Sequence, residues 1–103
     1  MARILIIEDE ESIRRVLSKI LVQSDPSHEI IEAKDGLEGI QIINQEDTID
    51  LVFCDIKMPK KDGTEVLQAI GDRTDELPVI MISGHGDLET AVECMRLGAF
   101  DYL

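Results

Sequence analysis

Apolar residues in this chain gather in short runs that alternate with segments of helical periodicity. Most of these runs are rich in β-branched residues and short enough to be buried strands rather than helices. Five strands are predicted in this way: RILII (3–7), HEIIEA (28–33), DLVFC (50–54), LPVIMI (77–82) and FDYL (100–103). The last run reaches the final residue of the sequence.

The segments between the strands have apolar residues at helical spacing. From Glu10 to Gln23 one face of a predicted helix carries Ile13, Val16, Leu17, Ile20 and Leu21. Three shorter helices are marked by Leu37, Ile40 and Ile43, by Val66, Leu67 and Ile70, and by Leu88, Val92 and Met95. Asp35-Gly36 predicts a turn, and the last helix has a predicted N-cap at Asp87 and C-cap at Gly98.

This alternation of strand and helix predicts an α/β fold with a parallel sheet and helices on both of its faces. With 103 residues, the chain is expected to form one domain around one core. In open sheets of this kind, ligands bind beyond the carboxyl ends of the strands. The residues that follow each predicted strand are therefore the first candidates for a functional site.

Composition and charge narrow the function classes. Apolar residues make up 44% of the chain, which predicts a folded domain rather than a disordered one. The formal net charge of -12 argues against binding to a nucleic-acid backbone and favours a basic partner or a bound cation.

Cysteine usage and hydropathy bear on the compartment. Cys54 and Cys94 lack the spacing of a metal site, and both are predicted to be buried thiols in a reducing cytosol. The N-terminal segment turns acidic too early for a secretory signal, and no apolar run is long enough to span a bilayer. We therefore expect a cytoplasmic domain without a membrane contact.

Polar residues follow three of the predicted strands. They are Glu8, Asp9 and Glu10 after the first, Asp55 at the end of the third, and Ser83 with Gly84, His85 and Gly86 after the fourth. If these strands are neighbours in a parallel sheet, their polar ends meet at one edge. Carboxylates held close together repel, which raises their pKa values or requires a cation. A solvated loop or a helix N-terminus would explain any one acid, such as Asp9 or Glu10, but not the coincidence across three strands.

Oxygen ligands without His or Cys favour Mg²⁺, with Mn²⁺ as the alternative. A carboxylate beside such an ion is suited to phosphoryl transfer, in which Asp55 attacks phosphorus and becomes an acyl phosphate. Ser83 would then be expected to hydrogen-bond a phosphoryl oxygen, and the small residues of SGHG would let backbone amides approach it.

Four motifs, in order and at characteristic spacing, resemble the bacterial response-regulator receiver domain: ILIIEDE, LVFCDIKMPKKDG, PVIMISGHGD and GAFDYL. The resemblance covers residues 1–103, and the stretch from SGHGD to FDYL looks most like receivers of AAA+ transcriptional activators. It implies a doubly wound, flavodoxin-like sheet of five parallel strands. It also implies Mg²⁺-dependent phosphorylation by a sensor histidine kinase or phosphotransfer protein.

The resemblance also implies a role for individual residues. Asp55 matches the phosphoacceptor, and Asp9 and Asp55 match the acidic metal ligands. Glu8 matches an acid that usually acts through water, and the backbone carbonyl of Lys57 matches the third protein ligand. Ser83 matches the switch hydroxyl and Tyr102 the switch aromatic. Lys57 and His85 also match positions that tune the lifetime of the phosphoryl group. Met58-Pro59 and Gly63 match the loop that shapes the pocket.

Structural alternatives remain for several of these residues. Tyr102 would also fit an aromatic half-buried at a sheet edge, and Ser83 a simple turn. His85 would fit an exposed loop residue, and Met58 is better explained by loop packing than by ligation.

The family's pattern continues beyond Leu103. It implies a lysine shortly after the switch aromatic and then a fifth helix, and neither Lys57, Lys60 nor Lys61 matches that lysine. We therefore expect a domain truncated at Leu103, with apolar surface that the missing helix would cover and that favours self-association.

The predicted function is a phosphorylation-driven switch rather than an enzyme acting on external substrates. Its output is expected through an effector domain in the full-length regulator or through a homodimer. One alternative is a Mg²⁺-dependent phosphohydrolase with an aspartyl nucleophile, but such enzymes typically carry a second Asp where this chain has Lys57. A second alternative is a phosphorylation-independent interaction module. A nucleotide-binding domain is disfavoured because no phosphate-binding Gly-rich loop follows the first strand.

Overall fold

A computed structural model of the chain describes residues 2–56, 58, 62–82 and 88–103. It contains five strands: β1 (Arg3–Ile7), β2 (Glu29–Ala33), β3 (Leu51–Asp55), β4 (Val79–Ile82) and β5 (Asp101–Tyr102). The α-helices are α1 (Glu11–Ser24), α2 (Gly36–Gln45), α3 (Gly63–Ile70) and α4 (Leu88–Arg96), and a 3₁₀ helix, η1, covers Gly71–Asp75. Every predicted strand and helix is present with boundaries shifted by a few residues, whereas η1 was not predicted.

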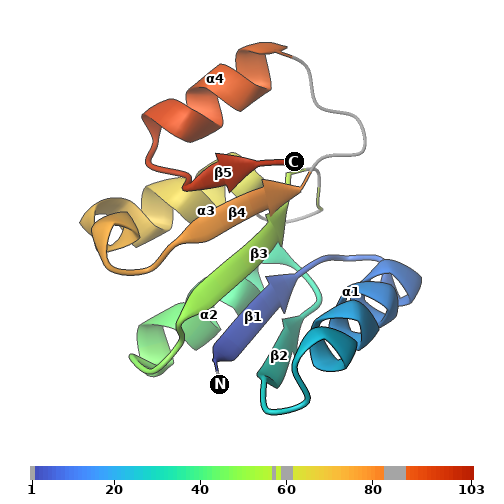
Figure 1. Ribbon diagram of the computed structural model, residues 1–103. Helices are drawn as coiled ribbons and strands as arrows, with labels where there is room; N and C mark the ends of the chain where they lie inside the picture. The colour runs from blue at the N-terminus through green and yellow to red at the C-terminus, as the bar shows by residue number, and fades with distance from the viewer. Residues whose placement is uncertain (1, 57, 59–61, 83–87) are drawn as a thin grey trace.

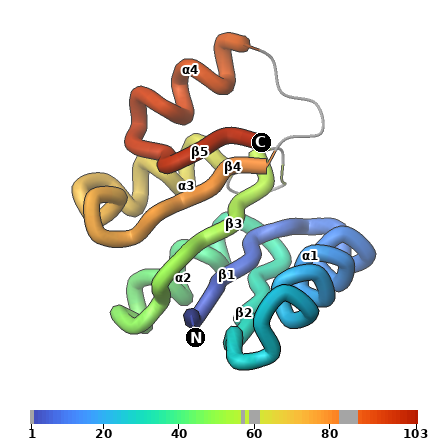
Figure 2. Tube along the Cα trace, viewed as in Figure 1, coloured from blue at the N-terminus to red at the C-terminus, as the bar shows by residue number. Residues whose placement is uncertain are grey.

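The strands form one parallel sheet in the order β2-β1-β3-β4-β5 (Figure 1). This is the doubly wound topology expected from the alternation of elements. β1 and β3 are direct neighbours, with Ile7 level with Cys54. The carboxyl ends of all five strands therefore lie at the same edge of the sheet, and the chain's last residue lies there too (Figure 2).

The main core lies on the sheet face that carries α2, α3 and α4. In β3 and β4 alternate residues are buried, as a strand's two-residue period requires, and Val52, Cys54, Val79 and Met81 point into this core. In β1 all positions from 4 to 7 are buried, because this strand is covered on both faces. Cys54 and Cys94 are both buried free thiols, as predicted.

The opposite face of the sheet carries α1, which buries less than its pattern predicted. Leu17 and Leu21 are half-buried, but Ile13, Val16 and Ile20 are exposed, and no residue of α1 is fully buried. In the described part of the chain, α1 is the only helix on this face (Figure 1), so the outer part of its apolar stripe stays open to solvent.

Local sequence explains how several elements begin and end. The Asp35 side chain accepts a hydrogen bond from the Glu38 amide and thereby caps α2, a more specific role than the predicted turn. After α4, Gly98 has φ +106°, and the bond from its amide to the Met95 carbonyl completes a C-terminal cap, as predicted. The predicted cap at Asp87 lies outside the described residues.

No helix in the described ranges combines the length and the apolar character needed to cross a membrane.

Candidate functional site

The first part of the site is the turn that links β1 to α1. The amide of Glu8 still bonds to the Ala33 carbonyl (3.1 Å), so Glu8 extends the pairing of β1 with β2 by one residue. Its side chain folds back over the turn, where one carboxylate oxygen accepts the Glu10 amide (3.2 Å). Glu8 is 5% exposed, whereas Asp9, the next residue, is exposed. The turn therefore presents one buried and one accessible carboxylate.

The second part is the end of β3, which carries Asp55. This residue is half-buried, and its Oδ1 accepts the Ile56 amide at 2.8 Å. The Ile56 carbonyl in turn accepts the amide of Gly63, the first residue of α3, also at 2.8 Å. The described ends of the β3–α3 connection are thus held together beside Asp55.

The start of α3 explains why this connection closes tightly. Asp62 accepts the Glu65 amide (3.0 Å) and Glu65 accepts the Asp62 amide (3.3 Å), which forms a reciprocal capping box. At Gly63 an added Cβ would lie 2.8 Å from the Asp55 backbone oxygen and 2.5 Å from the Met81 methyl carbon. Only glycine allows this approach, so the pocket-loop role implied for Gly63 has a steric basis.

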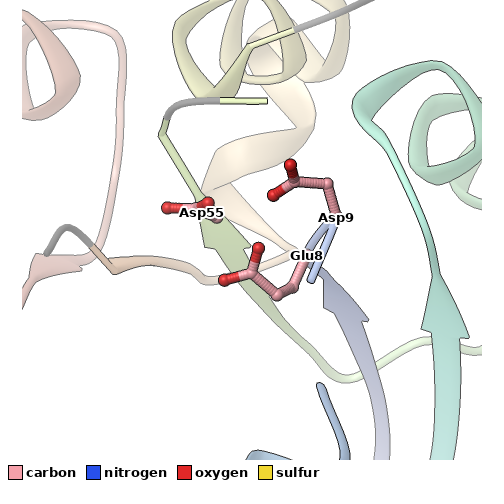
Figure 3. A group of neighbouring side chains, drawn as sticks. All are labelled: Glu8, Asp9 and Asp55. Carbon is pink, nitrogen blue, oxygen red and sulfur yellow. The ribbon is translucent and has the colours of Figure 1, made fainter. Parts of the chain in front are cut away.

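The adjacency of β1 and β3 brings three carboxylates together. One oxygen from each of Glu8, Asp9 and Asp55 lies within 4.8 Å of the others, and the three side chains converge in front of the strand ends (Figure 3). Glu8 and Asp9 follow β1 and Asp55 ends β3, and these two strands are distant in sequence but paired in the sheet. The predicted convergence of these acids is therefore observed for two of the three strand ends.

Burial and mutual repulsion perturb this cluster. The pKa of Glu8 is raised from 4.5 to about 8, first by its burial, then by a hydrogen bond with Asp9 and by the negative charge of Asp55. Protonation of Glu8 thus relieves the repulsion when no cation is present. The donor set fits a small hard divalent ion, because all three groups offer carboxylate oxygens at one point.

The structure describes only some of the remaining predicted site residues. Lys57, Ser83 and His85 lie outside the described residues, as do Pro59, Lys60 and Lys61. Tyr102 lies on β5, level with Met81, and packs half-buried against the core. Its hydroxyl oxygen is buried and has no hydrogen-bond partner among the described residues. Met58 packs against the core, in agreement with the packing explanation.

Three residues at this site were missed by the sequence analysis. Asp62 and Glu65 form the pattern Asp-x-x-Glu before an apolar run, which is a recognised capping signal and could have been found. Arg14, by contrast, reaches from α1 to the backbone of Glu8 (2.9 Å). No sequence pattern predicts the contact between Arg14 and Glu8, because it depends on how α1 lies across the sheet.

Comparison with known proteins adds independent information. Residues 4–103 match the family model described as the response regulator receiver domain. The chain is 36% identical over 102 residues to the regulatory protein AtoC of Escherichia coli K12, a match that covers 98% of this chain and 21% of AtoC. The chain thus spans about a fifth of the length of this curated relative.

Solved structures of response regulators have the same fold as this chain. A response regulator receiver domain protein from Clostridium thermocellum superposes with a TM-score of 0.88 at 39% identity, over 100% of this chain and 81% of that one. The Mn²⁺-bound form of the response regulator Rcp1 superposes with a TM-score of 0.89 at 28% identity, over 100% of this chain and 80% of that one.

Proposed function

The chain belongs to the response regulator receiver domain family, and we propose that it accepts a phosphoryl group on Asp55 with the help of Mg²⁺. The family acts in two-component signal transduction, and several relatives of this chain are transcriptional regulators. Among receivers, it resembles those of AAA+ transcriptional activators. The observation that carries the site assignment is the convergence of Glu8, Asp9 and Asp55 at one edge of the sheet.

In this proposal Asp55 is the nucleophile. One of its carboxylate oxygens forms a bond to phosphorus as the P–N bond of a phosphohistidine breaks, and the departing imidazole nitrogen keeps the electron pair and takes up a proton. The Ile56 amide holds Oδ1 of Asp55 at 2.8 Å, which fixes the orientation of the carboxylate before the reaction.

Asp9, Asp55 and the Lys57 backbone carbonyl would hold Mg²⁺ or Mn²⁺, with Glu8 acting directly or through water. The bound ion supplies positive charge that stabilises the phosphoryl oxygens in the transition state. Support comes from the oxygen-only donor set and from the likeness to an Mn²⁺-bound response regulator. The raised pKa of Glu8 also fits, because a buried acid surrounded by acids is relieved by a cation.

Ser83 and Tyr102 are proposed to report the phosphorylation state. The phosphoryl group adds about 1.5 to 2 negative charges and new acceptor oxygens, which Ser83 would approach as Tyr102 moves inward. The buried hydroxyl of Tyr102, which finds no partner among the described residues, supports a side chain that has a second favourable position. The face formed by α4 and β5 would change with it.

The proposed partners follow from the same function. A sensor histidine kinase or phosphotransfer protein would donate the phosphoryl group in the cytoplasm, and an output domain of the full-length regulator or a second copy of the chain would read the changed face. The net charge of -12 favours a basic surface on the partner and disfavours direct contact with DNA.

Phosphorylation can be tested with acetyl phosphate and Mg²⁺, followed by intact-mass measurement. We expect one added phosphoryl group that hydroxylamine removes, as for an acyl phosphate, and none in Asp55→Asn. Asp50→Asn is a matched control, because it makes the same change just before the other end of β3. Phosphorylation that persists in Asp55→Asn would refute the assignment.

The switch and the absence of external turnover need separate measurements. Beryllofluoride with Mg²⁺ should move the NMR signals of Ser83 and Tyr102, and unchanged signals would contradict the switch. A phosphate-release assay on small phosphate esters should give no sustained turnover. Sustained turnover lost in Asp55→Asn would instead favour the phosphohydrolase alternative.

A further inference from the structure

The β1–α1 turn carries two of the proposed metal ligands, and its backbone is held by a side chain outside the acidic cluster. Nη1 of Arg14 donates a hydrogen bond to the backbone carbonyl of Glu8 at 2.9 Å. Nε of the same guanidinium donates to Oε1 of Glu32 on β2 at 3.2 Å. Arg14 therefore connects the turn before α1 to the neighbouring strand.

The contact differs in kind from an ordinary surface ion pair. The Arg14 side chain is only 16% exposed, and its guanidinium uses two of its donors on two different elements. The next residue, Arg15, pairs only along its own helix with Glu11 at 2.9 Å, with side chains 76% and 66% exposed. A solvated pair of that kind contributes little to structure. The Arg14 guanidinium is instead part-buried and bonds both to the Glu8 carbonyl and to Glu32, which is itself 42% exposed, so the backbone carbonyl is the group that it restrains.

Arg14 restrains the part of the β1–α1 turn that repulsion between the carboxylates would displace. At Glu8 the amide is bonded to β2, the carboxylate to the Glu10 amide, and the carbonyl to Arg14. When the clustered carboxylates are ionised they repel one another, and rotation of the turn would relieve that repulsion by moving Glu8 and Asp9 away from Asp55. Fixing the Glu8 carbonyl opposes this rotation.

We propose that Arg14 is a positioning residue for the divalent cation: held by Glu32, it fixes the Glu8 carbonyl and so keeps the carboxylates of Glu8 and Asp9 turned toward Asp55. This inference rests on the proposed function, because it concerns the same site. Arg14 touches neither the proposed ion nor the phosphoryl group. Its contribution is the orientation of the groups that do, a role in which partners outside the ligand set commonly change metal affinity by about 10- to 100-fold.

The test compares Mn²⁺ affinity, measured by electron paramagnetic resonance, in the wild-type chain, Arg14→Met, Arg14→Lys and Arg15→Met. Arg14→Met keeps much of the side chain's apolar length but removes all donors, and we expect it to weaken Mn²⁺ binding about tenfold or more. Arg14→Lys offers one rotatable ammonium in place of the fork and should rescue part of the affinity. Arg15→Met removes the same charge one residue away and should stay within about twofold of wild type, because that pair is solvated.

A second measurement separates positioning from a general structural role. With acetyl phosphate as donor, Arg14→Met should need more Mn²⁺ to reach half its maximal phosphorylation rate, while the rate at saturating Mn²⁺ stays near that of wild type. A merely structural loss would lower the maximal rate and leave the Mn²⁺ requirement unchanged, and that result would overturn the inference. If Arg14→Met does not fold, the comparison of Arg14→Lys with Arg15→Met decides in the same way.

Failure of this inference is distinct from failure of the proposed function. If the wild-type chain binds Mn²⁺ and Arg14→Met and Arg14→Lys bind it equally well, or if Arg15→Met loses as much, Arg14 has no positioning role and the phosphoacceptor proposal stands. If the wild-type chain binds no Mn²⁺ and is not phosphorylated, both are wrong.

Discussion

Replacement of Glu8 by Gln gives the sharpest test of the acidic cluster, because it removes one charge and keeps nearly the same shape. Without a cation, the folded chain keeps a proton on Glu8 up to about pH 8, while the unfolded chain releases it near pH 4.5. The folded state binds more protons throughout this window, so the free energy of unfolding falls as the pH rises through it. Gln carries no such proton, and the advantage of Glu8→Gln over wild type should therefore grow across the same window.

The size of the effect follows from the pKa shift. A rise from 4.5 to about 8 corresponds to about 5 kcal/mol as an upper limit, at about 1.36 kcal/mol for each pH unit. Two unit charges 4.8 Å apart repel by about 3.5 kcal/mol at an effective dielectric constant of about 20, so the cluster geometry and burial are sufficient causes. A gain of a few kcal/mol for Glu8→Gln at pH 8, vanishing near pH 4.5, is the expected result.

The assay is urea unfolding at several pH values in the presence of EDTA, and then again with Mg²⁺. Adding Mg²⁺ should stabilise the wild-type chain most at the highest pH, whereas Glu8→Gln should gain less from the ion. Glu10→Gln removes an equal charge from an exposed side chain of the same turn and is the control. A difference between Glu8→Gln and wild type that is independent of pH, or equal in Glu10→Gln, would refute the reasoning.

Substitutions at three further positions test the parts that surround the cluster, each by urea unfolding. Gly63→Ala should lower the free energy of unfolding by about 2–3 kcal/mol, because its Cβ would meet the Asp55 backbone oxygen at 2.8 Å and the Met81 methyl at 2.5 Å. An unchanged midpoint of urea unfolding would mean that the loop moves aside freely. Asp62→Ala should lower the free energy of unfolding by about 1 kcal/mol, because it removes the cap of α3. Asp62→Asn can still accept the amide and should lower it less. Equal losses in the two variants would mean that the charge of Asp62, and not its cap, is what stabilises the helix. Tyr102→Phe should leave the stability unchanged or raise it by up to about 1 kcal/mol, because the buried hydroxyl has no partner among the described residues; a clear loss would reveal one.

Much of the fold could be predicted because its signals are local. Strands such as β1 and β3 are short apolar runs, and the parallel sheet follows from their alternation with helices. The sequence could not supply the order of the strands, which decides whether Asp9 and Asp55 meet. Nor could it reveal that the apolar stripe of α1 is only partly covered, since burial depends on which elements share that face of the sheet.

Part of the candidate site could likewise be predicted from the sequence, and part of it could not. Glu8, Asp9 and Asp55 were identified because acids directly follow predicted strands, and the general rule for ligand position in parallel sheets brought them together. The raised pKa of Glu8 could be expected in direction but not in size, because its largest cause is burial, which depends on the tertiary structure. Arg14 was missed because a basic residue in the first turns of a helix has no pattern of its own, and only the tertiary contact gives it a role.

The pairing of β1 with β3 has a consequence for when the chain becomes responsive. The three clustered acids belong to residues 8–55, while Tyr102 lies on β5, a strand that follows them in the sequence. Nearly half the chain separates Asp9 from Asp55, so an unfolded polypeptide rarely chelates one ion with both. If the proposed site holds an ion, chelation would require the amino-terminal half to be assembled, and the proposed switch through Tyr102 would also require β5 to be docked. Transient detachment of the edge strand β5 would leave a molecule that could still bind the ion but could not transmit phosphorylation to the α4–β5 face.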